Sequence, residues 1–112
     1  MREVDNTVKR GSAELAVLSV LEPGPMHGYE IAKRIEQRTG GVLRFDVASL
    51  YPLLYRMEKE ELVSANWDES SSGRRRRYYQ LTSAGKKKLK PLREQWKIFF
   101  EALNQIAGFQ NA

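Results

Sequence analysis

The sequence predicts a mainly α-helical fold with a small β-hairpin, which is an α+β class. Three patterns indicate this fold. Residues 12–60 hold three segments with apolar residues at helical spacing, residues 63–81 alternate around a polar turn, and residues 89–106 carry an apolar heptad stripe. At 112 residues the chain has the size of one domain, so these elements are expected to share one core.

The first predicted helix covers residues 12–21. Leu15, Leu18 and Leu21 recur there at helical spacing, and Ser12 can act as the N-cap. The Pro-Gly-Pro segment at residues 23–25 ends this helix, because proline has no amide hydrogen to donate and disfavours helix in the residue before it.

The second and third predicted helices cover residues 28–38 and 49–60. Gly40 and Gly41 close the second helix. Pro52 falls in the first turn of the third, where proline is tolerated. The inward stripes of the two helices consist of Tyr29, Ile31, Ala32, Ile35, Leu50, Leu53, Leu54 and Met57.

In residues 63–81, apolar side chains recur at every second position on either side of a polar turn at residues 68–73, which predicts a two-stranded hairpin. Three helices followed by a hairpin with a basic tip is the order of a winged helix-turn-helix. In that arrangement the third helix enters the major groove of DNA and the hairpin, called the wing, lies against the backbone. Residues 1–82 are therefore expected to form this winged domain. The inward face of its hairpin is predicted to carry Val63, Ala65, Trp67, Tyr79 and Leu81.

Residues 83–112 are predicted to form a long C-terminal helix within the same compact unit, with Thr82 as its N-cap. Pro91 should kink this helix near residues 87–90 and divide it into two pieces. Its apolar stripe is larger than one thin winged domain can cover, so either the domain folds back over the helix or a second copy of the chain covers it. A homodimer is the expected arrangement. The stripe consists of Leu89, Leu92, Trp96, Phe99, Leu103 and Ile106, with Phe100 at its flank.

The charge of the chain favours nucleic acid as a partner. The net charge is +5, and residues 74–90 contain four arginines, four lysines and no acidic residue. Such a segment attracts polyanions, which are nucleic acid first and anionic lipid second.

Other classes of function are disfavoured. The chain has no cysteine, and its single histidine, His27, is better suited to capping or packing than to metal binding. The carboxylates are interleaved with lysine and arginine, so no acid and base pair can be assembled and no enzyme or cofactor is expected. No apolar run is long enough to span a bilayer and residues 1–9 do not resemble a signal peptide, so a cytoplasmic location is expected.

Three segments together resemble the PadR family of transcriptional regulators, in particular its short members with a single C-terminal helix. The segments are His27-Gly28-Tyr29-Glu30-Ile31, then Ser49-Leu50-Tyr51-Pro52-Leu53-Leu54 with Tyr55-Arg56-Met57-Glu58, and finally Gly73-Arg74 with Tyr78-Tyr79-Gln80-Leu81-Thr82 and Gly85. The resemblance implies a homodimer that acts mostly as a repressor and responds in many cases to small hydrophobic or phenolic effectors.

The chain departs from the family pattern at two places. Glu61 stands where the family usually has a glycine after the recognition helix, so it must adopt a left-handed conformation or end the helix differently. In the wing, the family's glycine, arginine, proline, arginine and lysine become a glycine followed by four arginines at residues 73–77, which adds charge for phosphate.

The residues expected to contact DNA lie on the third helix, on the wing and at the starts of the first two helices. Hydroxyl groups near the start of a recognition helix can bond bases or phosphates, arginines of a wing suit phosphates, and helix starts present amides to phosphate. Arg74 and Arg76 should share one face of the hairpin, opposite Arg75 and Arg77. The predicted contacts are Ser49, Tyr51, Tyr55, Arg56, Arg74, Arg75, Arg76, Arg77, Tyr29, Lys9 and Arg10.

Alternatives stay open for several residues. Tyr51 and Tyr55 can simply pack against neighbouring helices, and Arg56 can form an ion pair with Glu60. Trp96 and Phe100 can be dimer core, or Trp96 and its symmetry mate can line a flat cavity for a planar aromatic effector, as the family resemblance suggests.

Two further interpretations concern the whole chain. It can be a winged-helix protein-interaction module without specific DNA binding, or residues 86–100 can be an amphipathic helix at a membrane surface. The dimer seam explains the same apolar residues without lipid, so no membrane partner is expected.

Overall fold

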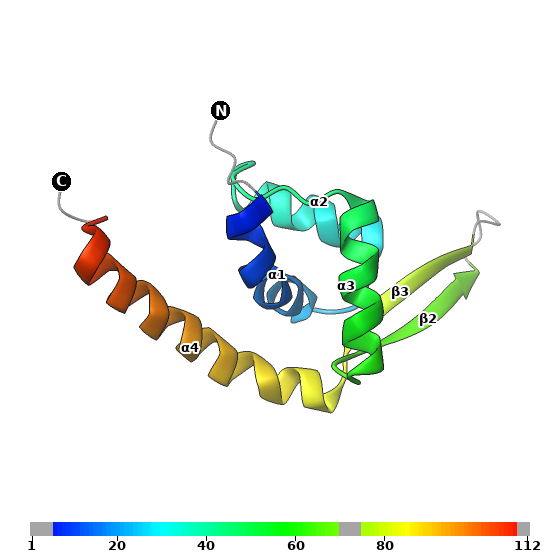
Figure 1. Cartoon of the computed structure of the whole chain (residues 1–112). Coiled ribbons are helices and arrows are strands. Elements are labelled where there is room, and N and C mark those ends of the chain that lie inside the picture. The colour runs from blue at the N-terminus through cyan, green and yellow to red at the C-terminus, as the bar shows by residue number, and fades with distance from the viewer. Residues whose placement is uncertain (1–5, 70–74, 110–112) are drawn as a thin grey trace.

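The structure, a computed structural model, describes residues 6–69 and 75–109. Three helices form a compact body, a hairpin projects from it, and the last helix leaves the base of the hairpin and runs past the first helix (Figure 1). The predicted α+β class is confirmed. The elements are α1 (Asn6–Leu21), β1 (Met26–His27), α2 (Gly28–Arg38), α3 (Val47–Lys59), β2 (Val63–Glu69), β3 (Arg75–Leu81) and α4 (Ser83–Ala107).

Helix α1 begins at Asn6, so the prediction that Ser12 caps it is wrong. Ser12 lies inside the helix instead. Serine costs only about 0.5 kcal/mol more than alanine in a helix interior, so a residue that can cap a helix does not by itself define where one begins. The predicted end is correct, because α1 stops at Leu21 before the Pro-Gly-Pro segment.

Helix α2 has the predicted bounds and α3 does not. His27 caps α2, with its Nδ1 accepting a hydrogen bond from the amide of Glu30 at 3.2 Å. Helix α3 begins at Val47, which makes Pro52 its sixth residue, so the placement of this proline in the first turn is wrong. Pro52 cannot donate the usual bond to the carbonyl of Ala48, and both residues lie on the exposed side of α3, where water can hydrate that carbonyl.

Of the two alternatives for Glu61, the structure shows the left-handed conformation, with a φ of +62°. The amide of Leu62 donates to the carbonyl of Met57 at 2.9 Å, and that of Glu61 donates to the carbonyl of Glu58 at 3.0 Å. These two bonds form a Schellman motif, which turns the chain sharply from α3 into β2.

The sheet has a third strand that the sequence pattern did not indicate. Strand β3 lies between β1 and β2, and all neighbours are antiparallel. Met26 pairs with Tyr79 and His27 with Tyr78, which ties the start of α2 to the wing. Strand β1 has two residues, too few to show any alternation, and its pairing with β3 joins residues far apart in the chain.

The core lies between the three helices and the base of the sheet, and α4 adds to it. Leu89 is only 2% exposed within this core and Leu92 packs against it. Leu89 therefore stabilises the domain of its own chain, which corrects its assignment to a seam between two chains. Leu92 is half-buried, so its place in such a seam stays a prediction. Thr82 caps α4 as predicted, since its Oγ1 accepts from the amide of Gly85 at 3.0 Å.

Helix α4 continues without interruption through Pro91, so it is one element rather than the two predicted pieces. Two ion pairs hold its first half beside α1. Lys88 pairs with Glu14 of α1 at 2.8 Å, and Arg93 pairs with Glu22, the residue after α1, at 2.7 Å. The bond from Arg93 lowers the pKa of the Glu22 carboxyl. None of the helices, within the described ranges, has the length and apolarity to cross a membrane.

Candidate nucleic-acid interface

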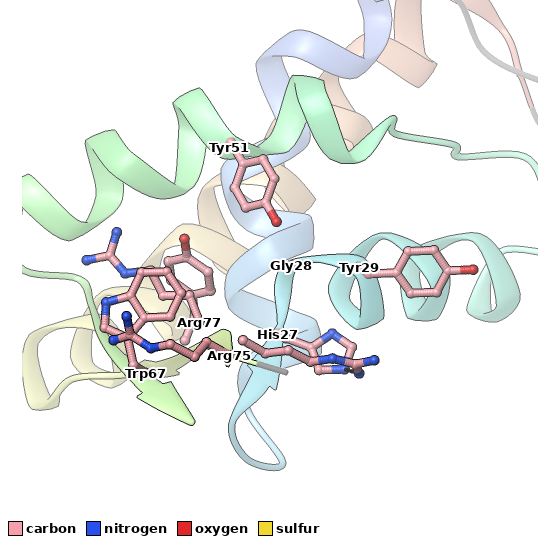
Figure 2. Close-up of a pocket in the computed structure, with 9 residues that line it drawn as sticks. His27, Gly28, Tyr29, Tyr51, Trp67, Arg75 and Arg77 are labelled. Carbon is pink, nitrogen blue, oxygen red and sulfur yellow. Dashed lines mark hydrogen bonds between the residues drawn. The ribbon is translucent and has the colours of Figure 1, made fainter. Parts of the chain in front are cut away.

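A hollow of about 590 Å³ separates the N-terminal half of α3 from the wing. The start of α2 forms its floor, and Figure 2 shows Tyr51 on the side of α3 and Trp67 with two arginines on the side of the wing. We call this hollow the helix–wing groove. Its lining residues are His27, Gly28, Tyr29, Tyr51, Trp67, Arg75, Arg76, Arg77 and Tyr79.

The outer face of α3 carries most of the residues predicted to touch base edges. Ser49, Tyr51 and Tyr55 are exposed, whereas Leu50 and Leu54 on the opposite face are buried. Tyr55 is 60% exposed, so it is not the buried packing residue that the alternative would require. This face of α3 therefore presents hydroxyl groups and aromatic rings to solvent.

Tyr51 combines the two roles that the sequence left open. It is 49% exposed, yet its ring also lies against the backbone at the start of α2. A Cβ added at Gly28 would lie 3.1 Å from the Tyr51 ring, which is closer than ordinary van der Waals contact. The missing side chain at Gly28 thus gives Tyr51 its place at the edge of the groove.

Arg56 reaches toward α1. Its guanidinium lies 3.5 Å from Glu14 and 4.0 Å from Glu60, so the ion pair with Glu60 that the sequence offered as an alternative is present. Glu14 also pairs with Lys88 of α4. Arg56 is 58% exposed and therefore connects α3 to the rest of the domain at its surface.

Three arginines of the wing are described, and they divide between its two faces as predicted. Arg75 stacks over the Trp67 ring at 4.6 Å from the centroid, and Arg77 lies 5.8 Å from the same ring. Arg76 points to the opposite face, where its Nη1 lies 3.0 Å from Nε2 of His27. Arg74 lies outside the described residues, so its pairing with Arg76 stays a prediction.

Arg77 holds the wing to α3. Its Nη2 donates to Oε2 of Glu58 at 2.8 Å, and its guanidinium lies 5.9 Å from the Tyr79 ring centroid. Oε1 of Glu58 and Nε of Arg77 are buried without a hydrogen-bond partner, so this ion pair is only partly satisfied. The sequence suggested a phosphate contact for Arg77, and the structure gives it an internal partner.

Burial raises the pKa of the Tyr79 hydroxyl above its ordinary value of 10.0, and nearby Arg77 opposes this to a smaller extent. Tyr79 is therefore neutral at neutral pH and forms an uncharged wall of the groove between the arginines.

Three of the predicted contacts lie in the first half of α1 and at the start of α2. Tyr29 is 61% exposed at the start of α2, so its expected place on the inward stripe of that helix is wrong. It lines a second hollow of about 360 Å³ together with Lys33, Arg34 and Arg76. The outward position of Lys33 and Arg34 was predicted, but their proximity to the wing follows only from the pairing of β1 with β3. Lys9 and Arg10 lie in α1, and their side chains fall outside the described part of the structure.

The second half of α4 exposes a cluster of aromatic rings. Trp96 is half-buried, Phe99 is 52% exposed and Phe100 is 57% exposed. Ring centroids lie 5.5 Å apart for Trp96 and Phe99 and 6.2 Å apart for Trp96 and Phe100. Leu103 is half-buried and Ile106 is 85% exposed further along the helix.

Sequence reasoning missed two exposed apolar residues in this region. Ile98 is 50% exposed but lies about 200° round the helix from Trp96 and Phe100, on another face. Phe109, just after the helix, is 61% exposed. Phe109 lies beside Phe100 at an open hollow near the end of α4. Among residues 6–69 and 75–109, no group of three histidine or carboxylate side chains could hold a metal ion.

The fold and sequence agree with known regulators. The model of the transcriptional regulator PadR-like family matches residues 17–91. An uncharacterised protein X from Lysinibacillus sphaericus is 33% identical over 93 residues, which cover 83% of this chain and 85% of that protein.

Two solved structures have closely similar folds. A transcriptional regulator from Clostridium thermocellum has a TM-score of 0.81 and 31% identity, and the match covers 89% of this chain and 97% of that one. A PadR family transcription regulator from Clostridium difficile has a TM-score of 0.75 and 34% identity, with 87% and 99% covered. The chain therefore belongs to the PadR-like family of transcriptional regulators, a family of regulators rather than enzymes.

Proposed function

We propose that this chain is a homodimeric, sequence-specific DNA-binding repressor of transcription. One observation carries the proposal: the exposed face of α3 faces an arginine-rich wing, and its Tyr51 lies across the helix–wing groove from Arg75, Arg76 and Arg77. A helix of this kind can enter the major groove while cations beside it neutralise phosphates.

Ser49, Tyr51 and Tyr55 are the residues of α3 that we assign to base edges and nearby phosphates. Arg75 and Arg76 of the wing and Tyr29 of α2 line the helix–wing groove. We assign them to the sugar–phosphate backbone of DNA. We also assign Arg74, Lys9 and Arg10 to phosphates of the DNA backbone, because of their positive charge alone. Arg56 and Arg77 act mainly by holding α3 to α1 and to the wing, because both have carboxylate partners.

A second copy of the chain is the partner we propose for α4. Phe99, Phe100 and Ile106 are all more than half exposed, and apolar side chains gathered on one helix favour burial against another protein surface. Two chains joined there can present their α3 helices to successive major grooves, which are about 34 Å apart.

The dimer has a direct test. Phe99→Glu should shift the mass measured by light scattering at micromolar concentration from two chains to one. Lys97→Gln is the control, because it changes the net charge by the same amount at a position about 200° further round the helix. Equal masses for the two variants would contradict the proposed dimer surface.

We also propose that a small planar aromatic compound regulates DNA binding by entering between the two copies of Trp96. The support is the exposed ring cluster of Trp96, Phe99 and Phe100, whose flat faces suit such a ligand. Binding there would change the distance between the two α3 helices and lower the affinity for DNA. Isothermal titration with a panel of planar aromatic compounds tests this, and no binding across the panel would contradict it.

The experiment for DNA binding is a gel-shift titration with the DNA upstream of the chain's own gene and a scrambled duplex of equal length. The upstream DNA should bind at least about 1,000-fold more tightly, with an affinity that falls steeply as salt rises. Equal, weak binding of both duplexes would overturn the specific regulator. A monomer without any DNA affinity would favour a protein-interaction module instead.

A further inference from the structure

An exposed tryptophan lies on the wing face that points toward α3. Trp67 lies on the same face of β2 as Val63, yet Val63 is 1% exposed and Trp67 is 56% exposed. The difference arises because β2 continues beyond the edge of the core. Arg75 stacks on the exposed ring at 4.6 Å from its centroid. Trp67 and Arg75 therefore form a flat apolar surface with a cation held on it.

This pair lines the helix–wing groove opposite Tyr51 (Figure 2). Every charged side chain among the described residues that line the groove is an arginine. The volume of about 590 Å³ lies within the range of about 300–1,000 Å³ that ligand sites usually have. The groove thus combines room, aromatic walls and positive charge, which suits an anionic occupant with an apolar part.

The sugar–phosphate backbone of DNA has this chemistry. When a recognition helix lies in the major groove and a wing lies over the adjacent minor groove, the strand that separates the two grooves must pass between helix and wing. In this chain the helix–wing groove occupies the corresponding position between α3 and the wing. Trp67 of β2 and the arginines of β3 line it on one side, and Tyr51 of α3 lines it on the other.

We propose that Trp67 packs on a deoxyribose of the strand that passes through the helix–wing groove, while Arg75 binds the adjacent phosphate. The proposal rests on the proposed entry of α3 into the major groove. An indole ring packs on the C–H groups of a sugar without reading the base, so the contact adds affinity for every sequence equally. The contact also fixes how closely the wing approaches the DNA, and this sets the position of α3 along the major groove.

The two tryptophans of the chain allow a test on the intact protein. Labelling with 5-fluorotryptophan gives two ¹⁹F signals, and Trp67→Phe assigns them. Saturating duplex should shift the Trp67 signal and reduce its response to exchange of H₂O for D₂O, because the sugar covers the ring. Fluorescence anisotropy of the labelled duplex in the same sample shows whether DNA is bound.

Affinities give an independent test. Trp67→Ala should weaken binding of the upstream duplex and of a scrambled duplex by the same factor, about 3- to 10-fold. Its salt dependence should stay unchanged, whereas Arg75→Gln should lower the salt slope by about one unit. Trp67→Phe keeps an aromatic ring and should lose less. Because Trp67 is exposed, thermal melts of these variants should match the parent protein.

The outcomes separate this inference from the proposed function. If the parent protein binds no duplex, the proposed function fails. If it binds duplex while the Trp67 signal stays in place, or if Trp67→Ala binds as tightly as the parent, only the backbone contact of Trp67 is overturned. A shift produced by a free mononucleotide and not by duplex would assign the groove to a small ligand and would also overturn it.

Discussion

Replacing Glu61 with glycine should stabilise the protein. Glu61 holds a φ of +62° at the end of α3, and an L residue with a Cβ in this region costs about 1–2 kcal/mol. Glycine removes this cost but loses about 0.5–1 kcal/mol more conformational entropy on folding. The difference predicts a net gain of about 0.5–1 kcal/mol in the free energy of unfolding, which corresponds to a rise of about 2–5 °C in Tm.

Urea denaturation at one fixed protein concentration measures this gain, since the stability of a dimer depends on concentration. Glu61→Ala is the matched control, because it removes the carboxylate and keeps the Cβ, so its stability should stay close to that of the parent. The conformational explanation would be refuted if Glu61→Gly were no more stable than the parent. It would also fail if Glu61→Ala gave the same gain, because the effect would then come from the lost charge.

Further predictions concern the junctions of α4 and of the wing. Thr82→Ala should lower the free energy of unfolding by about 1 kcal/mol in urea titrations, since it removes the cap of α4. Thr82→Ser keeps a hydroxyl that can cap the helix, so its free energy of unfolding should stay close to that of the parent protein. Gly85→Ala should cost about 1–3 kcal/mol, because its Cβ would overlap the carbonyl oxygen of Leu62, and an unchanged melt would contradict that contact. A double-mutant cycle with Glu58→Gln and Arg77→Gln should give a coupling of about 1 kcal/mol in stability, whereas additive effects would mean that this ion pair does not hold the wing. Burial raises the pKa of Tyr79, so its contribution to stability should be complete below about pH 10 and decrease as the pH rises through its folded-state pKa; Tyr79→Phe should remove that part of the slope in melts between about pH 9 and 11.

Local patterns predicted much of this fold. The glycine pair and the apolar stripe located α2 at its observed bounds, and Thr82 located the start of α4. Alternation in residues 63–81 predicted the hairpin and the division of its arginines between two faces. The resemblance to PadR regulators predicted the family, which the family model supports over residues 17–91.

The features that local patterns missed depend on contacts between distant parts of the chain. Strand β1 is too short to show a pattern, and only β3 makes it a strand. The heptad stripe could not reveal that Leu89 is buried in its own domain while Phe99 stays exposed, because both fit the same spacing. Alternation placed Trp67 on the inward face, but the strand extends past the core there. Likewise, the pairing of Arg77 with Glu58 and of Arg56 with Glu14 becomes visible only once α3 is packed, whereas the pair of Arg56 with Glu60 could be read from their spacing.

The central claim is that a dimer of this chain recognises a particular duplex through α3 and the wing. Sedimentation of a fluorescently labelled upstream duplex with increasing protein measures stoichiometry and affinity together, and a scrambled duplex measures specificity. We predict two chains per duplex at saturation and at least about 1,000-fold weaker binding of the scrambled DNA. A complex with one chain per duplex, or equal affinity for both duplexes, would contradict the claim.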